Sequence, residues 1–94
     1  MGGKCVEIYQ LRQFAAVAKT ENMTRAAQSL SMAQPAVSKT IRNLESELGA
    51  ELFERTGKGL RRTEQGDILL RYARAILNAE LDARREIEES LHRA

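Results

Sequence analysis

The stretch NMTRAAQSLSMAQPAVSK, residues 22–39, decides how this 94-residue chain folds. Asn22 is suited to cap a short helix over about 23–30, and the alanines at 26–27 leave so little side-chain bulk that another helix can approach closely. Residues 31–33 allow only a sharp turn. Pro35 fits the first turn of a following helix, because the N–H that it lacks would have no partner there. The stretch therefore predicts two helices joined by a tight turn.

The second of these helices is predicted to run from about Gln34 to Leu48 and to end at Gly49. Its apolar residues recur at steps of four, three and four, which gives one stripe toward the core, formed by Val37, Ile41, Leu44 and Leu48. The opposite face is polar and is formed by Pro35, Ser38, Lys39, Arg42, Asn43 and Ser46. We expect the stripe to hold the helix so that the polar face is turned outward.

The flanking segments complete a small domain. A helical pattern over about 8–19 precedes the pair, and two short extended pieces joined by a glycine-containing turn follow it over about 52–63. This hairpin has four positive charges and no acid over 55–62, from Arg55, Lys58, Arg61 and Arg62. Such short strands must pack on the helices to be stable.

A last helix is predicted from Glu64 to about His92, capped by Thr63 and roughly 43 Å long at 1.5 Å per residue. A helix of this length exceeds what so small a domain can cover, so we expect it to pair with a second copy of the chain. The expected dimer interface consists of Leu70, Ala73, Leu77, Leu81 and Ile87.

Charge divides the chain into two parts. Up to Thr63, ten Lys or Arg against six Asp or Glu give +4, whereas from Glu64 onward five against seven give −2. The basic front favours a polyanionic partner. No apolar run approaches the roughly 20 residues of a membrane span. The single cysteine, Cys5, cannot form an internal disulfide, and with the one histidine, His92, it cannot build a zinc site.

Helix, tight turn and a helix with a polar outer face is the arrangement that enters the major groove of DNA. Ser38 can donate or accept a hydrogen bond there, and Lys39 and Arg42 match guanine acceptors or phosphates. Gln34 can pair with adenine or with a phosphate. Pro35 offers an apolar surface to a thymine methyl group. Two other classes stay open: a protein-interaction module that works through the long helix, and an enzyme, for which no catalytic or metal-binding constellation is present.

Seven segments in order resemble the LysR-type transcriptional regulators. They are LRQFAAVA (11–18), NMTRAAQSL (22–30), QPAVSK (34–39), IRNLE (41–45), LG (48–49), LFER (52–55) and TEQG (63–66), and the likeness covers about residues 8–90. The resemblance implies a mainly α-helical fold: a winged helix-turn-helix domain over 6–63, with the helix-turn-helix at 23–42 and the wing at 52–63, followed by a linker and dimerisation helix over 64–92.

The resemblance further implies a cytoplasmic bacterial regulator that binds palindromic promoter DNA as a homodimer, and as a tetramer in the full-length protein. A small-molecule inducer is expected only for a C-terminal effector domain that this chain lacks; no cofactor is expected here. Carried over by position, the DNA contacts are Thr24, Arg25, Gln34, Pro35, Ser38, Lys39, Arg42, Arg55 and Lys58. The positive charge of the hairpin adds Arg61 and Arg62 to the expected DNA contacts.

Three positions depart from the family pattern. Ala33 stands where a serine often caps the recognition helix, so that side-chain cap is lost or passed to the backbone. Lys39 replaces a frequent arginine, which exchanges a planar fork for a point charge. Arg62 replaces an apolar residue or proline, so it either adds a phosphate contact or points to solvent.

Overall fold

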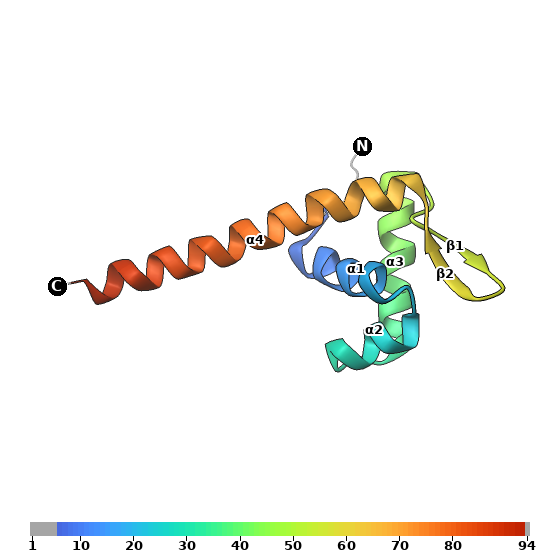
Figure 1. The fold of residues 1–94 in the computed structure, drawn as a ribbon, viewed down its shortest axis with the longest axis horizontal. Coiled ribbons are helices and arrows are strands. Elements are labelled where there is room, and N and C mark those ends of the chain that lie inside the picture. The colour runs from blue at the N-terminus through green and yellow to red at the C-terminus, as the bar shows by residue number, and fades with distance from the viewer. Residues whose placement is uncertain (1–5, 94) are drawn as a thin grey trace.

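The structure, a computed structural model, describes residues 6–93 and has four helices and one antiparallel hairpin in this range (Figure 1). Their order is α1 (Ile8–Thr20), α2 (Met23–Leu30), α3 (Gln34–Leu48), β1 (Phe53–Thr56), β2 (Gly59–Arg62) and α4 (Glu64–His92). The hairpin pairs Phe53 with Arg62 and Thr56 with Gly59. The predicted winged helix-turn-helix followed by a long helix is confirmed.

Local signals set the helix boundaries. The Asn22 side chain accepts a hydrogen bond of 2.9 Å from the Arg25 N–H at the start of α2, and the Thr63 hydroxyl accepts one of 3.0 Å from the Gly66 N–H at the start of α4. Gly49 ends α3 with a φ of 68°, a left-handed conformation that glycine adopts without strain. Ala33 starts α3 without a side-chain hydrogen bond, so the expected loss of that cap is confirmed.

One core joins all three short helices with the wing and the start of α4. Phe14 lies at its centre, fully buried, with its ring centroid 5.5 Å from that of Phe53 in β1. Ala26 and Ala27 are buried as expected from their small size, and Met32 packs against the core from the turn. This core fixes α3 beneath the start of α4 and beside the wing (Figure 1).

The predicted inward stripe of α3 is correct at three of its four positions. Val37, Ile41 and Leu44 are buried, but Leu48 is 45% exposed, so its assignment to the core was wrong. Leu48 is the last residue of the helix, where the chain turns away and no element covers it. Thr40 is buried instead, and its hydroxyl donates to the Ala36 carbonyl at 3.3 Å, which satisfies it within the helix.

The first turns of α4 pack onto the domain more closely than the sequence predicted. Leu70 and Ala73 are buried in the core, so their assignment to a dimer interface was wrong. Leu77 is half-buried, whereas Leu81 and Ile87 are exposed. The reason is that α1 lies along the first half of α4 and covers the face that carries Leu70 and Ala73 (Figure 1).

Gly66 shows how tightly α4 starts against the wing. A Cβ atom built on Gly66 would lie 2.2 Å from the carbonyl oxygen of Leu52, far inside van der Waals contact. The neighbouring Thr63 N–H donates to that same carbonyl at 3.1 Å. Only glycine leaves room for this approach, which gives Gly66 a packing reason although it weakens the first helical turn.

Candidate nucleic-acid interface

The outer face of α3 is free of the core. Gln34, Pro35, Lys39 and Arg42 are exposed, and Ser38 is half-buried one turn after Gln34, whose side-chain amide donates to its hydroxyl at 3.3 Å. The buried residues on the other side of the helix fix this orientation. The structure therefore presents the predicted contact residues of α3 on one accessible face.

A recess of about 240 Å³ separates α3 from the wing. From α3 it is lined by Ser38, Arg42 and the acid Glu45, from β1 by Arg55 and from β2 by Leu60. The hydroxyl of Ser38 and the two guanidinium groups are thus brought to one groove from segments well apart in the sequence. Such a combination provides both a hydrogen-bonding group and positive charge for an anionic ligand.

A second, wider hollow of about 790 Å³ lies between the wing and the corner that joins α1 to α2. Arg25 lines it from α2, and Lys58 and Arg61 line it from the wing. Leu60 borders this hollow as well as the first one. Five predicted cations therefore surround two adjoining hollows, namely Arg25, Arg42, Arg55, Lys58 and Arg61. Lys39 is exposed on α3 outside both linings, and Thr24 is exposed next to Arg25.

The cations around the hollows lack acidic partners. Within residues 6–93, no ion pair involves Arg25, Lys39, Arg42, Arg55, Lys58 or Arg61. The carboxylates that line the hollows accept backbone hydrogen bonds: Glu45 from the Leu52 N–H at 2.9 Å, and Glu21 from the Arg62 N–H at 3.2 Å. Glu54 lies opposite Arg61 in the hairpin but forms no ion pair with it. The surface thus keeps a set of exposed, uncompensated positive charges, which attracts a polyanion.

Arg62 is the exception among the predicted contacts. Its Nε atom lies 2.7 Å from Asp67 Oδ1, and its Nη1 atom donates to the Ala18 carbonyl at 2.7 Å. Two donors of the guanidinium are therefore engaged inside the domain, so the side chain does not simply point to solvent. The contacts with α1 and α4 favour an internal role for Arg62 over the predicted DNA contact.

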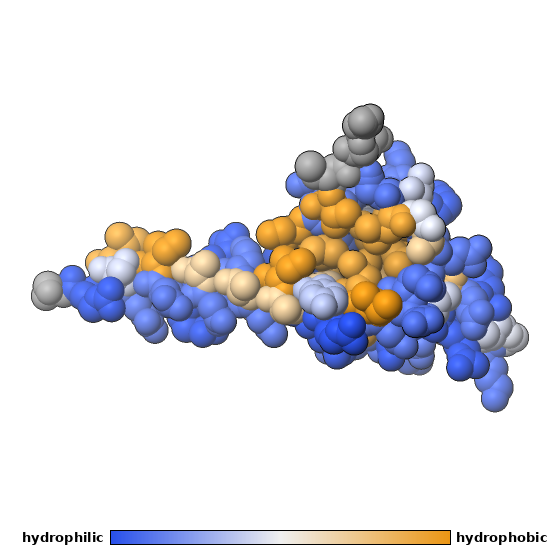
Figure 2. Space-filling view, turned by 90° about the horizontal axis from the view of Figure 1, so that it is seen from above, coloured by the Kyte–Doolittle hydropathy of each residue, from blue (hydrophilic) through white to orange (hydrophobic). Residues whose placement is uncertain are grey.

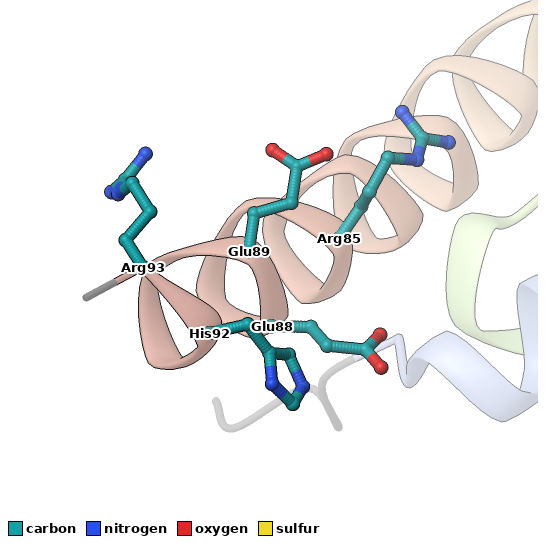
Figure 3. Close-up of a pocket in the computed structure, with 5 residues that line it drawn as sticks. All are labelled: Arg85, Glu88, Glu89, His92 and Arg93. Atoms are coloured by element: carbon teal, nitrogen blue, oxygen red, sulfur yellow. The ribbon is translucent and has the colours of Figure 1, made fainter.

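The far end of α4 has a shallow recess, which the sequence did not single out. It is lined by Arg85, Glu88, Glu89, His92 and Arg93. These residues come from the last turns of α4 and the residue after it, no other element faces them, and their side chains point apart (Figure 3). Across residues 6–93 no group of three or more His, Cys, Asp or Glu could hold a metal ion. Cys5 lies outside the described residues.

Arginines on α4 form ion pairs, in contrast to the unpaired cations around the two hollows. Glu80 accepts from Arg84 and lies 3.6 Å from Arg12 of α1, so one carboxylate bridges the two helices. The hydrogen bond and the charge of Glu80 raise the pKa of Arg84. Arg85 pairs in the same way with Asp82 at 3.0 Å. The cations Arg84 and Arg85 of this helix are thus paired with acids, in contrast to the cations around the hollows.

An apolar face runs along the first half of α4. Figure 2 shows a broad hydrophobic area there and a smaller one near the far end of the helix. The exposed hydrophobic residues at the start of the chain and along α4 are Val6, Ile8, Tyr9, Ile68, Tyr72, Ile76, Leu81, Ile87 and Leu91. Sequence reasoning missed Ile68 and Tyr72, although their spacing of four with Ile76 places all three on one side of a helix.

These elements define a winged helix-turn-helix domain with a long C-terminal helix, and the comparisons with known proteins agree. The family described as bacterial regulatory helix-turn-helix protein, lysR family, matches residues 8–67. The RuBisCO operon transcriptional regulator of Allochromatium vinosum is 48% identical over 86 residues, which are 92% of this chain and 28% of that protein. The chain belongs to the lysR family, a family of transcriptional regulators rather than enzymes.

Two solved structures show the same fold with DNA bound. The CbnR DBD–DNA complex superposes with a TM-score of 0.85 at 33% identity, covering 93% of this chain and 100% of that one. The BenM DBD/catB site 1 DNA complex gives a TM-score of 0.82 at 34% identity, with 95% and 99% covered. The chain spans less than a third of the curated relatives that it matches, and its likeness to these two domains extends over nearly their full length.

Proposed function

We propose that this chain binds double-stranded DNA in a sequence-specific manner, with α3 in the major groove and the wing on the adjacent backbone. One observation carries the proposal: six exposed cations, without acidic partners among residues 6–93, lie on α2, α3 and the wing. A docked α3 places its polar face against base edges. The similar domains of CbnR and BenM form complexes with DNA, which supports DNA binding by this fold.

Base readout and backbone contact fall to different elements. We assign base contacts to Gln34, Pro35, Ser38, Lys39 and Arg42 on α3, which faces outward along its whole polar side. Phosphate contacts fall to Thr24 and Arg25 at the start of α2 and to Arg55, Lys58 and Arg61 on the wing. Sequence discrimination then depends on α3, whereas the wing and α2 supply affinity that is nearly independent of sequence.

The bound form is a homodimer on a palindromic operator. The exposed apolar side of α4, with Ile68, Tyr72 and Ile76, supports pairing with a second copy, because a monomer would leave this area in water. Leu77, Leu81 and Ile87 remain in the proposed interface from the sequence. Two linked domains bind two half-sites, which strengthens binding beyond that of one domain.

The longer protein to which such a domain belongs is a cytoplasmic transcriptional regulator, tetrameric at its promoter. Its C-terminal part would bind a small-molecule inducer. None of the helices over residues 6–93 is both long and apolar enough to cross a membrane. The support for these properties comes from family membership.

Selection of bound sequences from random oligonucleotides, followed by binding measurements over a range of salt concentrations, tests the proposal. The affinity is expected to fall by nearly one log unit per log unit of salt for each phosphate neutralised. An affinity that stays flat between low and moderate salt would contradict it. A chain that is dimeric by light scattering and yet shifts no DNA would instead be a protein-interaction module, for which the apolar side of α4 is the candidate surface.

A further inference from the structure

Arg62 links three parts of the domain through one side chain. Its guanidinium donates from Nη1 to the Ala18 carbonyl in the last turns of α1 and from Nε to the Asp67 carboxylate in the first turn of α4, both at 2.7 Å. Two bonds from the same planar group fix its orientation, which a single flexible contact would not. The negative end of the α1 dipole further favours a cation at this place.

The backbone of Arg62 fastens the wing to the same region. Its N–H donates to Glu21 Oε2 at 3.2 Å, and Glu21 is the left-handed residue that ends α1 immediately before the Asn22 cap of α2. At the tip of β2, a Cβ on Gly59 would lie 3.6 Å from the Glu21 carbonyl oxygen. The first and last residues of β2, Gly59 and Arg62, therefore both lie against Glu21, in the turn between α1 and α2.

The position of the wing matters because its cations work with one on α2. Lys58 and Arg61 line the same hollow as Arg25, so the spacing of the three charges depends on how the wing is held against the corner. A two-stranded hairpin is only marginally stable by itself. Its anchors in the core are Leu52 and Phe53 at one end and the half-buried Leu60, while residues 54–59 and Arg61 are exposed.

We propose that Arg62, through Asp67 and Ala18, is a positioning residue that holds the wing so that Arg25, Lys58 and Arg61 bind the phosphate backbone together. This inference rests on the proposed DNA binding and adds to it a residue that touches no DNA. The ion pair between Arg62 and Asp67 also connects the wing to the start of α4. The helix proposed to join two copies and the surface proposed to contact DNA are therefore linked through Arg62.

A direct phosphate contact by Arg62 makes the opposite prediction for Asp67. In that case Asp67 competes with the phosphate for the guanidinium, and its removal frees Arg62 and strengthens DNA binding. The removal of a negative charge near DNA also favours binding by simple electrostatics. If Arg62 positions the wing, removal of Asp67 weakens binding in spite of both effects.

Glu64 provides a matched control. Like Asp67 it is an exposed carboxylate in the first turn of α4, but within residues 6–93 it forms no side-chain hydrogen bond or ion pair that the structure shows. We expect Asp67→Ala to lower the affinity of the chain for its selected operator by about fivefold, the size typical of coupling between contacting residues. Glu64→Ala is expected to leave the affinity unchanged or slightly higher. An Asp67→Ala chain that binds as well as Glu64→Ala, or better, overturns the proposal.

A double-mutant cycle tests how Arg62 acts. Lys58→Ala is expected to weaken binding clearly in the wild-type background and much less in the Arg62→Leu background, because Lys58 is then already misplaced. If the two substitutions have additive effects, and Arg62→Leu lowers the salt dependence of the affinity by the equivalent of one phosphate, Arg62 contacts DNA directly and the proposal is overturned.

If circular dichroism shows that the Arg62→Leu chain is unfolded, the comparison of Asp67→Ala with Glu64→Ala decides. A wild-type chain without DNA affinity would count against the proposed function, whereas wild-type binding with equal Asp67→Ala and Glu64→Ala affinities would count against the Arg62 inference alone.

Discussion

The front domain and the far half of α4 show the same helical patterning with different results. In α1 and α3 the apolar stripe meets neighbouring elements, and residues such as Phe14, Val37 and Leu44 are fully buried. From residue 81 to residue 93 every side chain is exposed, although Leu81, Ile87 and Leu91 are as apolar as the core. An amphipathic period therefore predicts which side of a helix is apolar, while the surrounding chain decides whether that side is core or contact surface.

The charges of the two regions differ in the same sense. On α4, Arg84 and Arg85 pair with acids three or four positions away, as is typical of a solvated helix. Around the hollows of the front, the cations have no acidic partner among residues 6–93. The domain over residues 6–63 therefore has a buried apolar core and unpaired surface cations, whereas the far half of α4 has paired arginines and exposed apolar residues.

Two substitutions compare a buried residue of the core with an exposed residue at the end of α4. Phe14→Ala removes a fully buried ring from the centre of the core, and we expect a loss of about 3–5 kcal/mol in the free energy of unfolding. Leu91→Ala, at a residue that is 76% exposed, is expected to change it by less than about 0.5 kcal/mol. Urea denaturation measures both. A comparable loss for Leu91→Ala would show that the end of α4 is covered in solution.

The next effect concerns the apolar side of α4. Ile76→Glu places a charge where Ile68, Tyr72 and Ile76 meet water in the single chain, and we expect monomers by sedimentation. Loss of the second half-site would lower the affinity for a complete operator by roughly a hundredfold. Asn78→Glu adds the same acid on another side of the helix and is the control. An Ile76→Glu chain that sediments as a dimer would place the interface elsewhere.

Gly66 tests the junction between the two regions. Gly66→Ala forces a Cβ to within 2.2 Å of the Leu52 carbonyl unless the start of α4 moves, and we expect a loss of about 1–3 kcal/mol. Gly57→Ala, where nothing lies within 4 Å of the added atom, is the matched control and is expected to be nearly neutral. Thermal melting followed by circular dichroism distinguishes the two. Equal melting temperatures would mean that α4 shifts freely on the wing.

The smallest effect concerns the start of α3. Ala33 has the extended backbone of a helix cap, with φ −73° and ψ 140°, but no side chain that can accept a hydrogen bond. Ala33→Ser is expected to raise the free energy of unfolding by about 1 kcal/mol, and Asn22→Ala, which removes an existing cap, to lower it by a similar amount. If both substitutions shift stability in the same direction, the capping interpretation of these two positions fails.

Much of the fold could be predicted because its signals are local. Asn22, Gly49 and Thr63 mark helix ends by the conformations and hydrogen bonds that these residue types prefer, and the structure has the ends at these positions. The polar side of α3 followed in the same way from its apolar side. Period and capping need no knowledge of what lies across the domain.

The positions that the sequence does not predict depend on what the rest of the fold places beside them. The charge of Arg62 suggests a DNA contact, whereas its internal contacts, with Asp67 five positions away and with Ala18 44 positions away, are evident only in the structure. Leu70 and Ala73 were assigned to a dimer because nothing local indicates that α1 covers them. Leu48 continues the stripe of α3 beyond the last element that could cover it.

In the proposed mode of binding, α3 reads the DNA sequence while the wing supplies affinity. The ratio of operator affinity to random-DNA affinity, measured at fixed salt, separates these two roles. Ser38→Ala or Arg42→Ala is expected to lower this ratio, by about tenfold for Arg42, because a lost base contact costs on the order of 1–3 kcal/mol of discrimination. Lys58→Ala is expected to weaken both affinities about equally and to leave the ratio unchanged. An unchanged ratio for Arg42→Ala and Ser38→Ala, together with a lowered ratio for Lys58→Ala, would contradict this account.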